Sequence, residues 1–585
     1  MQAIHTERRV IGPMKREEGW FTTRLFWKFF IPSLLSSIGL SVGAVADSIY
    51  VGRTLSESGL FVIGAASPVY MIFSTIGLGA AEGGSIHFAT ALSEGKADEA
   101  RKFFFSTAAF IFGSILSLCI LGQIFAGPLI ALLGCSTDSA AYPMMMGYVR
   151  RMLLCSPVLF MQAPLQYFVH TDNDPKLASM SLVAGNIVDC VLGFVFIVIL
   201  HMGVNGSIWS TVCGAVVMEG ICLSHFFGGK GILNLKRPAV SLRKALLAFR
   251  TGLASSAQYI YQFLSILLFN RILLRISGEM GVAVYDIVIN AGSLVTAVID
   301  ASVLALVPIV STYFGERNND AIRDTFKVTM VTAFGISLCE SVVFGYFAVN
   351  ICGIMGLSGK FLERGRIALI LYLAGIVISS LNIVIAAFFQ SIGKETLSYM
   401  ITALRGLNVL LPAGFLLSKL GYTSFWMSFA VTELIVLMLS AAFMFYQIRI
   451  RRTQLLHRED KIFSRFFEGQ AENISVVIEE MQAFLEELDV SAKKAYFVAL
   501  AVDETCQLIA ENGSGLKMQL TLIAEENEFI LHIRDNATRF NPMDVSDEDE
   551  HGMGLRIVKN QARDFFYREF LGFNTLTITF EGDAK

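Results

Sequence analysis

The segment ALSEGKADEAR (91–101) recurs as YFGERNNDAIR (313–323), 222 residues further along the chain. The charged positions that coincide in this match are Glu94/Glu316, Asp98/Asp320 and Arg101/Arg323. A second pair of segments, ALLGCS (131–136) and GIMGLS (353–358), matches at the same offset. Either match alone is weak, but two matches at one offset predict that the chain holds two copies of one structural unit.

Apolar runs long enough to cross a bilayer fill most of both copies. The chain is 54% hydrophobic and 16% charged, whereas soluble proteins average about 25% charged, and a membrane helix needs about 20 apolar residues. The runs lie near 27–52, 60–86, 103–126, 148–170, 176–200, 203–227, 247–276, 283–311, 326–351, 366–390, 397–418 and 422–448. Because each copy contains six runs, the copies share one orientation. The predicted fold is an all-α polytopic membrane protein of twelve transmembrane helices in two parallel six-helix repeats.

Charge divides the chain into a basic and an acidic part. Residues 461–585 contain 12 Lys+Arg against 23 Asp+Glu, a net of −11, which leaves +8 for the first 460 residues. Basic residues precede the first span, fill the connection between the sixth and seventh spans, and follow the last span at Arg449–Arg452. This pattern predicts a multi-pass protein of the plasma membrane with both termini in the cytoplasm. It does not indicate a nucleic-acid partner.

These observations predict six segments. They are a cytoplasmic N-terminal segment (1–24), a first six-helix lobe (25–227), a cytoplasmic inter-lobe loop (228–246), a second six-helix lobe (247–448), a basic juxtamembrane linker (449–460) and a C-terminal domain (461–585). The short linker keeps the C-terminal domain close to the membrane. We expect a regulatory contact between this domain and cytoplasmic loops such as Lys230–Lys244.

Several spaced motifs in the membrane part resemble the multidrug and toxic compound extrusion (MATE) family. They are SPVYMIFSTIGLGAAEGGSIHFATALSEGKADEAR (67–101), TDNDPKLA (171–178), QSIGKE (390–395), the Pro32 to Asp47 stretch and the Arg405–Pro412 stretch. The resemblance covers about residues 20–450. It implies an exporter of organic, often cationic, compounds that is coupled to H⁺ or Na⁺.

Asp47 is the leading candidate for cation coupling. A charge near the bilayer centre costs a few kcal/mol, and Gly39, Gly43 and Asp47 lie on one helical face where small residues favour contact with another helix. Binding of H⁺ or Na⁺ would neutralise the carboxylate, and release would restore a charge that attracts a cationic substrate. The MATE resemblance also implies a coupling acid at this position. The alternative is a buried structural ion pair.

A second candidate acid is Asp189, in the fifth span. Members of the family often carry Asn there and Asp four residues later, where this chain has Asp189 and then Gly193. In the second repeat, Asn270 lies close to the position equivalent to Asp47. The nearby polar stripe consists of Gln258, Gln262 and Ser265. Two interpretations of the stripe stay open, a substrate cavity in the second lobe and polar packing between helices.

Other acids within or near the spans are expected to form structural ion pairs. They are Glu82, Glu219, Asp286, Asp300, Glu340 and Glu433. The arginines predicted to neutralise some of them are Arg271, Arg275 and Arg405.

The C-terminal domain is predicted to be an α+β sandwich, with helices on one face of an antiparallel sheet. The expected order is helix (473–488), helix (491–511), strand (517–524), strand (528–535), acidic loop (541–551), helix (553–564) and strand (574–581).

Three motifs of this domain, AVDET (501–505), RDNATRFNP (534–542) and HGMGLRIV (551–558), resemble the GHKL ATP-binding fold, most closely the anti-sigma-factor serine kinases. The resemblance implies that Glu504 is a general base and that a carboxylate in the second motif accepts a hydrogen bond from adenine. Glycines at a helix start let the backbone approach phosphate. The predicted nucleotide-binding residues are Asp535, Asn536, Gly552 and Gly554.

The domain departs from this family at its metal site. The family places a magnesium-binding Asn four residues after the general base, and this chain has Leu508 there. Ala537 also replaces a customary Gly. Because leucine cannot ligate Mg²⁺, which normally clamps the phosphates, we expect ATP binding without dependable Mg²⁺-dependent phosphoryl transfer. No residue cluster indicates another metal site. A degenerate domain kept for protein contacts is the alternative.

Two functional classes follow from the two parts. The first is a cation-coupled antiporter of small organic compounds with a cytoplasmic, nucleotide-binding regulatory domain and a cytoplasmic regulatory partner. The second is a membrane sensor whose C-terminal domain acts as a serine kinase or an anti-sigma-like partner-binding module. ATP-driven transport is disfavoured because GxxxxGK[ST] does not occur in the chain.

Overall fold

The structure is a computed structural model. It describes residues 19–93, 97–172, 174–228, 233, 239–446, 461–511, 513, 515–525, 528–538, 540–542, 552–570 and 573–581. The basic segment Arg449–Arg452, which follows the last span, therefore lies outside the described residues.

Helices make up the membrane part. The first repeat contains α1 (Gly19–Ser93), α2 (Ala97–Ile124), α3 (Ala126–Leu132), α4 (Tyr142–Leu159), α5 (Gln162–Thr171), α6 (Pro175–Gly193), the π-helix η2 (Phe194–Ile199) and α7 (Val204–Gly228). The second repeat contains α8 (Leu242–Ser277), α9 (Glu279–Gly315), α10 (Asn319–Tyr346), α11 (Ala348–Ile354), α12 (Gly359–Ser391), α13 (Glu395–Ala403), the π-helix η3 (Leu404–Asn408), α14 (Leu410–Ser418) and α15 (Tyr422–Phe445).

Helix α1 holds the first two predicted spans. Its 75 residues would extend about 110 Å as a straight helix, several times the hydrocarbon thickness of a bilayer. Among the described residues, 11 helical stretches are long and apolar enough to cross a membrane, and they coincide with the second to twelfth predicted spans. The first predicted span, 27–52, forms the first part of α1. The chain is thus a multi-pass membrane protein.

The internal duplication is visible in the helix bounds. Helices α2 and α10 begin and end 222 residues apart, and so do α3 and α11. Gly134 and Gly356 follow α3 and α11 with φ of 95° and 103°, a left-handed conformation that glycine adopts without steric cost. The offset read from the sequence is confirmed as a structural repeat.

The first helix of the second repeat crosses onto the first repeat. In this crossing, α8 packs backbone to backbone on the later part of α1. A Cβ on Gly83 would lie 2.1 Å from the carbonyl oxygen of Ala248, and a Cβ on Gly252 would lie 1.7 Å from that of Gly79. Glycine is therefore required for this approach.

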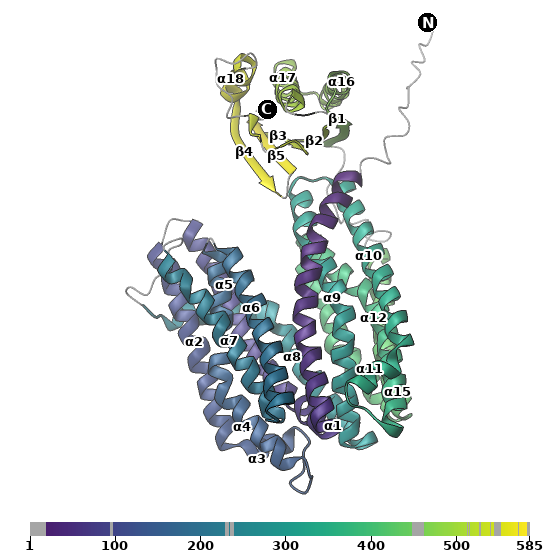
Figure 1. The fold of residues 1–585 in the computed structure, drawn as a ribbon. Coiled ribbons are helices and arrows are strands. Elements are labelled where there is room, and N and C mark those ends of the chain that lie inside the picture. Colours follow the sequence, from purple (N-terminus) through teal and green to yellow (C-terminus); the bar gives the residue numbers. More distant parts are fainter. Residues whose placement is uncertain are drawn as a thin grey trace.

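The first part of α1 makes the equivalent crossing onto the second repeat. Phe26 and Phe30 are buried in one apolar cluster with Ala301 and Ala305 of α9. These four positions correspond, at the 222-residue offset, to those of the α8 crossing. Figure 1 accordingly shows α1 beside α9 in the bundle formed by the second repeat. Large side chains on α1 take the place of the close backbone contact made by α8.

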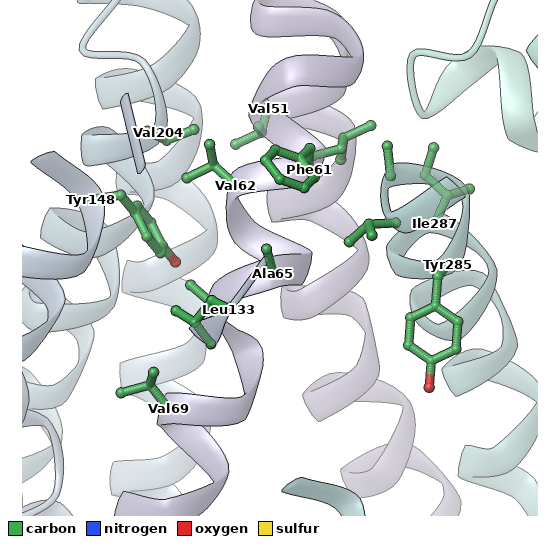
Figure 2. Close-up of a cluster of buried hydrophobic side chains, with 14 of the residues drawn as sticks. Val51, Phe61, Val62, Ala65, Val69, Leu133, Tyr148, Val204, Tyr285 and Ile287 are labelled. Atoms are coloured by element: carbon green, nitrogen blue, oxygen red, sulfur yellow. The ribbon is translucent and has the colours of Figure 1, made fainter. Parts of the chain in front are cut away.

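A continuous apolar core joins the two repeats through α1. Figure 2 shows Phe61 and Val62 of α1 between Tyr148 of α4 on one side and Ile287 of α9 on the other. All four side chains are buried, as is Val204 at the start of α7. Because this core excludes water, a polar group placed in it must find a protein partner.

The C-terminal domain is a helix-covered antiparallel sheet, as predicted. Its elements are β1 (Ile462–Glu468), α16 (Ala471–Glu487), α17 (Ala492–Glu511), β2 (Lys517–Ala524), β3 (Glu528–Asp535), α18 (Gly552–Gln561), β4 (Ala562–Phe570) and β5 (Phe573–Glu581). The strand order is β1-β2-β3-β5-β4. The three helices lie on the side of the sheet away from the membrane helices (Figure 1).

Two expectations for this domain were wrong. Strand β1 was not predicted, and the predicted helix 553–564 ends at Gln561, where β4 begins. Strand β4 contains Phe565, Phe566 and Tyr567, and aromatic residues favour strands. Pairing of these residues with β5 therefore outweighs continuation of α18 beyond Gln561.

Candidate functional site

Asp47 lies on the first part of α1, but its side chain is outside the described residues. The next turn of α1 is described. Tyr50 contacts Cys190 of α6 with 3.7 Å between Oη and Sγ, and its ring lies 5.9 Å from that of Phe194. The backbone at Asp47 is therefore one turn from a contact with α6, the helix that carries Asp189.

Asp189 is half-buried and faces α7. Thr211 Oγ1 donates to Asp189 Oδ1 at 3.3 Å, and Gly214 packs against the Cβ of Asp189. Within the described part of the chain, no Lys, Arg or His side chain forms an ion pair with Asp189. The sequence reasoning missed Thr211, although its place in an apolar span was a signal. Ser210, beside Thr211 on α7, also hydrogen-bonds to Asp189, so the described polar partners of this acid are hydroxyl groups.

The predicted polar stripe of the second repeat is divided by the structure. Ser265 is buried and donates to the carbonyl oxygen of Gly406 in η3 at 2.7 Å. Gln262 is exposed, and the side chain of Gln258 lies outside the described residues. The described contact of Ser265 is polar packing between helices, the second of the two interpretations.

Asn270 joins the two repeats. Its Nδ2 donates to the carbonyl oxygen of Gly64 at 3.0 Å, and its Oδ1 has no hydrogen-bond partner among the described residues. Asp286 of α9 lies against the same glycine. Asn270 is therefore positioned at the inter-repeat contact.

One predicted ion pair is confirmed in the second repeat. Arg405 of η3 donates to both carboxylate oxygens of Glu433 on α15, with Nε–Oε2 at 2.8 Å and Nη2–Oε1 at 2.8 Å. Asn382 of α12 donates to Glu433 Oε2 at 2.8 Å, and Arg405 also donates to Ser379. This network fixes the position of the Glu433 carboxylate.

Among the described residues, Arg271, Glu219 and Glu340 show none of the expected ion pairs. Arg271 donates instead to the carbonyl oxygens of Ala131 and Leu132, at the end of α3. Glu219 and Glu340 each keep one buried carboxylate oxygen without a hydrogen-bond partner. Carbonyl groups at a helix end attract cations, which explains the position of Arg271.

In the C-terminal domain, Asp535 ends β3 on the helix-covered face. Its Oδ1 accepts from Asn574 Nδ2 at 2.8 Å and from the Ala537 amide at 2.9 Å. Burial raises the pKa of Asp535 to about 6, and these two hydrogen bonds oppose that shift. The remaining acceptor capacity of a buried carboxylate suits an exocyclic amino group such as that of adenine.

Glu504 of α17 lies against the start of α18, near Gly554. A Cβ on Gly554 would lie 2.0 Å from Glu504 Oε1, so only glycine fits there without displacing the carboxylate. The approach that glycine allows to the backbone at this helix start fits a phosphate group as well. Gly552 begins α18, but its surroundings and the acidic loop lie outside the described residues.

The metal position does not fit Mg²⁺. Leu508 is buried on α17, and among the described residues no cluster of His, Cys, Asp or Glu would hold a metal ion. Asn536 is used structurally, since its Oδ1 accepts from the Lys517 amide at 2.7 Å. The described residues therefore place an apolar side chain, Leu508, where the predicted site would need a metal ligand.

Asn574 is a site residue that the sequence reasoning missed. It holds Asp535 and in turn accepts from the Tyr567 hydroxyl at 2.7 Å. The strand alternation carried a signal, because Asn574 shares the helix-facing phase of β5 with Leu576 and Ile578, where an apolar residue is expected.

Comparisons with known proteins agree with both parts of the chain. The MatE family model matches residues 32–195 and 251–415, and the model described as "Histidine kinase-like ATPase domain" matches residues 467–580. The two MatE segments fall in the two repeats.

Two curated relatives share part of the membrane region. One is the "Probable multidrug resistance protein YoeA" of Bacillus subtilis, 23% identical over 192 residues, or 32% of this chain and 41% of that protein. The other is the "FAD transporter" of Shewanella oneidensis, 25% identical over 169 residues, or 29% of this chain and 37% of that protein. The chain thus aligns with less than half the length of either relative.

A solved structure shares the membrane fold. It is described as the inward-facing conformation of a multidrug resistance MATE family transporter of the MOP superfamily, with a TM-score of 0.63 and 21% identity. The match covers 70% of this chain and 94% of that one. At this identity the likeness concerns the fold.

Proposed function

Because the chain belongs to the MatE family, we propose that it exports small organic compounds by exchange for a cation, with a C-terminal histidine kinase-like ATPase domain that binds nucleotide and regulates export. The observation that carries the transport part is Asp189, an acid within the spans whose described polar partners are the hydroxyls of Ser210 and Thr211. Asp47, one turn from the contact between α1 and α6, is the second acid of the proposed site.

The proposed coupling depends on neutralising these acids. Binding of H⁺ or Na⁺ to Asp47 and Asp189 removes negative charge from an apolar environment, where an unpaired charge is costly. A cationic substrate competes for the same carboxylates. Mutual exclusion of cation and substrate is the basis of antiport.

We place the ATPase domain in the cytoplasm and the protein in the plasma membrane. The positive residues near both ends of the membrane part support this orientation. The two relatives are named for different roles, multidrug resistance and FAD transport. For this chain we propose organic cations because the candidate site contains acids.

The export proposal is tested with the full chain in sealed vesicles that contain ethidium, an aromatic cation. An imposed H⁺ or Na⁺ gradient should drive dye movement, and the gradient that works identifies the coupling ion. Asp98→Asn is the matched control, since Asp98 is 86% exposed and pairs with Arg101. Dye movement that ignores both gradients contradicts antiport.

The ATPase domain is proposed to bind ATP without Mg²⁺. Asp535, held by Asn574, would take the adenine, and the backbone at Gly554 would lie beside the phosphates. Bound nucleotide would supply a charged ligand that signals cellular energy state. Titration of ATP into the full chain, with and without Mg²⁺, should give equal affinities. A strong Mg²⁺ requirement together with a phosphorylated product lost in Glu504→Ala would favour the sensor kinase instead.

A further inference from the structure

The C-terminal domain contacts the membrane part through the face of its sheet that its own helices leave open. Along β2 and β3, Met518 and Ile533 point into the helix-covered core. Alternate residues point the other way, and among them Thr521 and Arg534 are only 2% and 6% exposed. The loop between α9 and α10 of the second repeat covers them.

A buried ion pair lies at the centre of this contact. Arg534 Nη2 donates to Glu316 Oε1 at 2.6 Å, and the two side chains are 7% and 10% exposed. The guanidinium also lies 4.5 Å from the ring centroid of Tyr313. Removing one member of such a pair leaves the other charge buried and uncompensated. Both charges of this pair are therefore compensated when the C-terminal domain is docked on the α9–α10 loop.

Asn318 adds a second polar connection beside the ion pair. Its Nδ2 donates to Ser464 Oγ at 3.3 Å and to Thr521 Oγ1 at 3.4 Å. Its Oδ1 accepts from the Ala321 amide at 3.0 Å and so caps α10. The position of the domain is thus tied to the start of α10.

The same sheet holds the start of α1. Phe21 packs edge-on against Phe466 of β1 and Phe573 of β5, with ring centroids 5.6 and 5.4 Å apart. Helix α1 carries Asp47, whereas the loop with Glu316 belongs to the second repeat. The docked domain therefore binds the first helix of one repeat to a loop of the other (Figure 1).

The nucleotide site lies directly behind this contact. Arg534 pairs with Thr575 across the β3–β5 ladder, and the next pair is Asp535 with Asn574. The side chains of the first pair meet at 3.2 Å from Arg534 Nε to Thr575 Oγ1, on the membrane side. Those of the second pair meet on the nucleotide side. The end of β3 therefore carries Arg534 of the docking contact and, next to it, Asp535 of the nucleotide site.

We propose that the ATPase domain is a nucleotide-strengthened clamp that slows transport by holding the start of α1 against the α9–α10 loop through Glu316 and Arg534. This inference rests on the proposed function and specifies its regulation. Alternating access requires the repeats to move relative to each other. Helix α1 begins in the bundle of the second repeat and continues into the first repeat, where it packs on α8, so a domain that holds the start of α1 opposes a shift of this helix. Nucleotide bound at Asp535 orders the end of β3, so less entropy is lost when Arg534 is fixed on Glu316.

The first test measures ethidium efflux from vesicles with the domain facing the added ATP. Saturating ATP should slow the wild type at least about fivefold, the lower end of usual allosteric couplings. Glu316→Gln should be fast and insensitive to ATP. Arg465→Gln is the matched control, because Arg465 pairs with Glu480 on the other face of the sheet, and it should behave like the wild type.

ATP affinity gives a readout independent of transport. Since coupling between ATP binding and docking of the domain is reciprocal, Glu316→Gln should weaken ATP binding to the detergent-solubilised full chain at least about fivefold. Equal ATP affinity in Glu316→Gln and wild type overturns the clamp.

A cross-link tests the clamp without removing the ion pair. In Asn318→Cys/Thr521→Cys, a short reducible bis-methanethiosulfonate should join the loop to β2 and slow efflux at least about fivefold without ATP. Reductant should restore the rate, and each single variant controls for reaction at native cysteines. Unchanged efflux in the cross-linked protein overturns the proposal.

If the wild type moves no dye, the export function fails, and ATP affinity in Glu316→Gln still decides the clamp. If dye moves but ATP has no effect, the clamp is wrong and export stands.

Discussion

Helices α2 and α10 occupy equivalent places in the two repeats and have the same length, yet acids elsewhere in the two repeats are held differently. In the first repeat Asp189 rests on the hydroxyl of Thr211. In the second, Glu433 is fixed by Arg405 and Asn382. Among the described residues, the second repeat forms a buried ion pair with the ATPase domain through Glu316. Duplication preserved the scaffold, and exchange chemistry, structural pairing and docking were then distributed unequally between the copies.

The largest expected effect is on the fixed acid. Glu433→Ala leaves the Arg405 charge unpaired among apolar helices and should lower the free energy of unfolding by about 3–5 kcal/mol. Thermal unfolding of the purified chain measures this loss. Arg405→Met/Glu433→Met should recover most of it, because no charge is left uncompensated. If Glu433→Ala is as stable as the wild type, Glu433 is not a structural ion-pair residue and the contrast with Asp189 is wrong.

The two helix crossings should respond unequally to matched changes. In Gly83→Ala the new Cβ meets the backbone of α8 at Ala248, so we expect a loss of about 1–3 kcal/mol, typical of overpacking. Ala305→Gly, at the equivalent position of α9, removes only a methyl group and adds backbone freedom, for about 1 kcal/mol. The same unfolding assay compares them. Equal losses would contradict the close contact seen only at α8.

Removing an exchangeable acid should impair transport and leave folding intact. Asp47→Asn and Asp189→Asn each lack the carboxylate that would bind and release the cation. Ethidium efflux should therefore fall at least about tenfold in each variant. Asp98→Asn controls for a change of charge outside the spans. If efflux persists in both variants, the first repeat does not hold the coupling site.

The ATPase domain adds a pH-dependent element on the side of the second repeat. Burial raises the pKa of Asp535 to about 6, so the carboxylate that accepts from adenine is present above this pH and is lost below it. ATP affinity should fall about tenfold from pH 7 to pH 5 for one linked proton. Asp535→Asn should bind ATP weakly at both pH values. Titration of the full chain checks this, and pH-independent wild-type affinity would exclude Asp535.

The smallest effect is expected where the repeats agree. Asp98–Arg101 and Asp320–Arg323 are equivalent exposed ion pairs one helical turn long. Asp98→Ala and Asp320→Ala should each change the free energy of unfolding by less than about 0.5 kcal/mol. A large loss in one variant alone would reveal a structural difference between the loops.

The expected contact of the ATPase domain with the loop Lys230–Lys244 stays a prediction. The proposed loop Lys230–Lys244 lies largely outside the described residues, and Lys244 pairs with Glu99 of α2. The described domain contact is instead with the α9–α10 loop and the start of α1. Glu316 was visible in the sequence as a repeated residue, but its match with Glu94 gave no reason to choose one copy over the other.

Patterns along the chain predicted the membrane spans, the duplication and three strands of the ATPase domain, β2, β3 and β5. Each depends on a pattern along the chain: apolar length, a fixed offset, and a period of two. The exchange of first helices between the repeats and the placement of Arg534 on Glu316 were decided only by the tertiary structure. These residues are 218 positions apart, and hydropathy does not specify which of two equivalent loops a domain will bind. That choice depends on the shape and charge of both surfaces once they are folded.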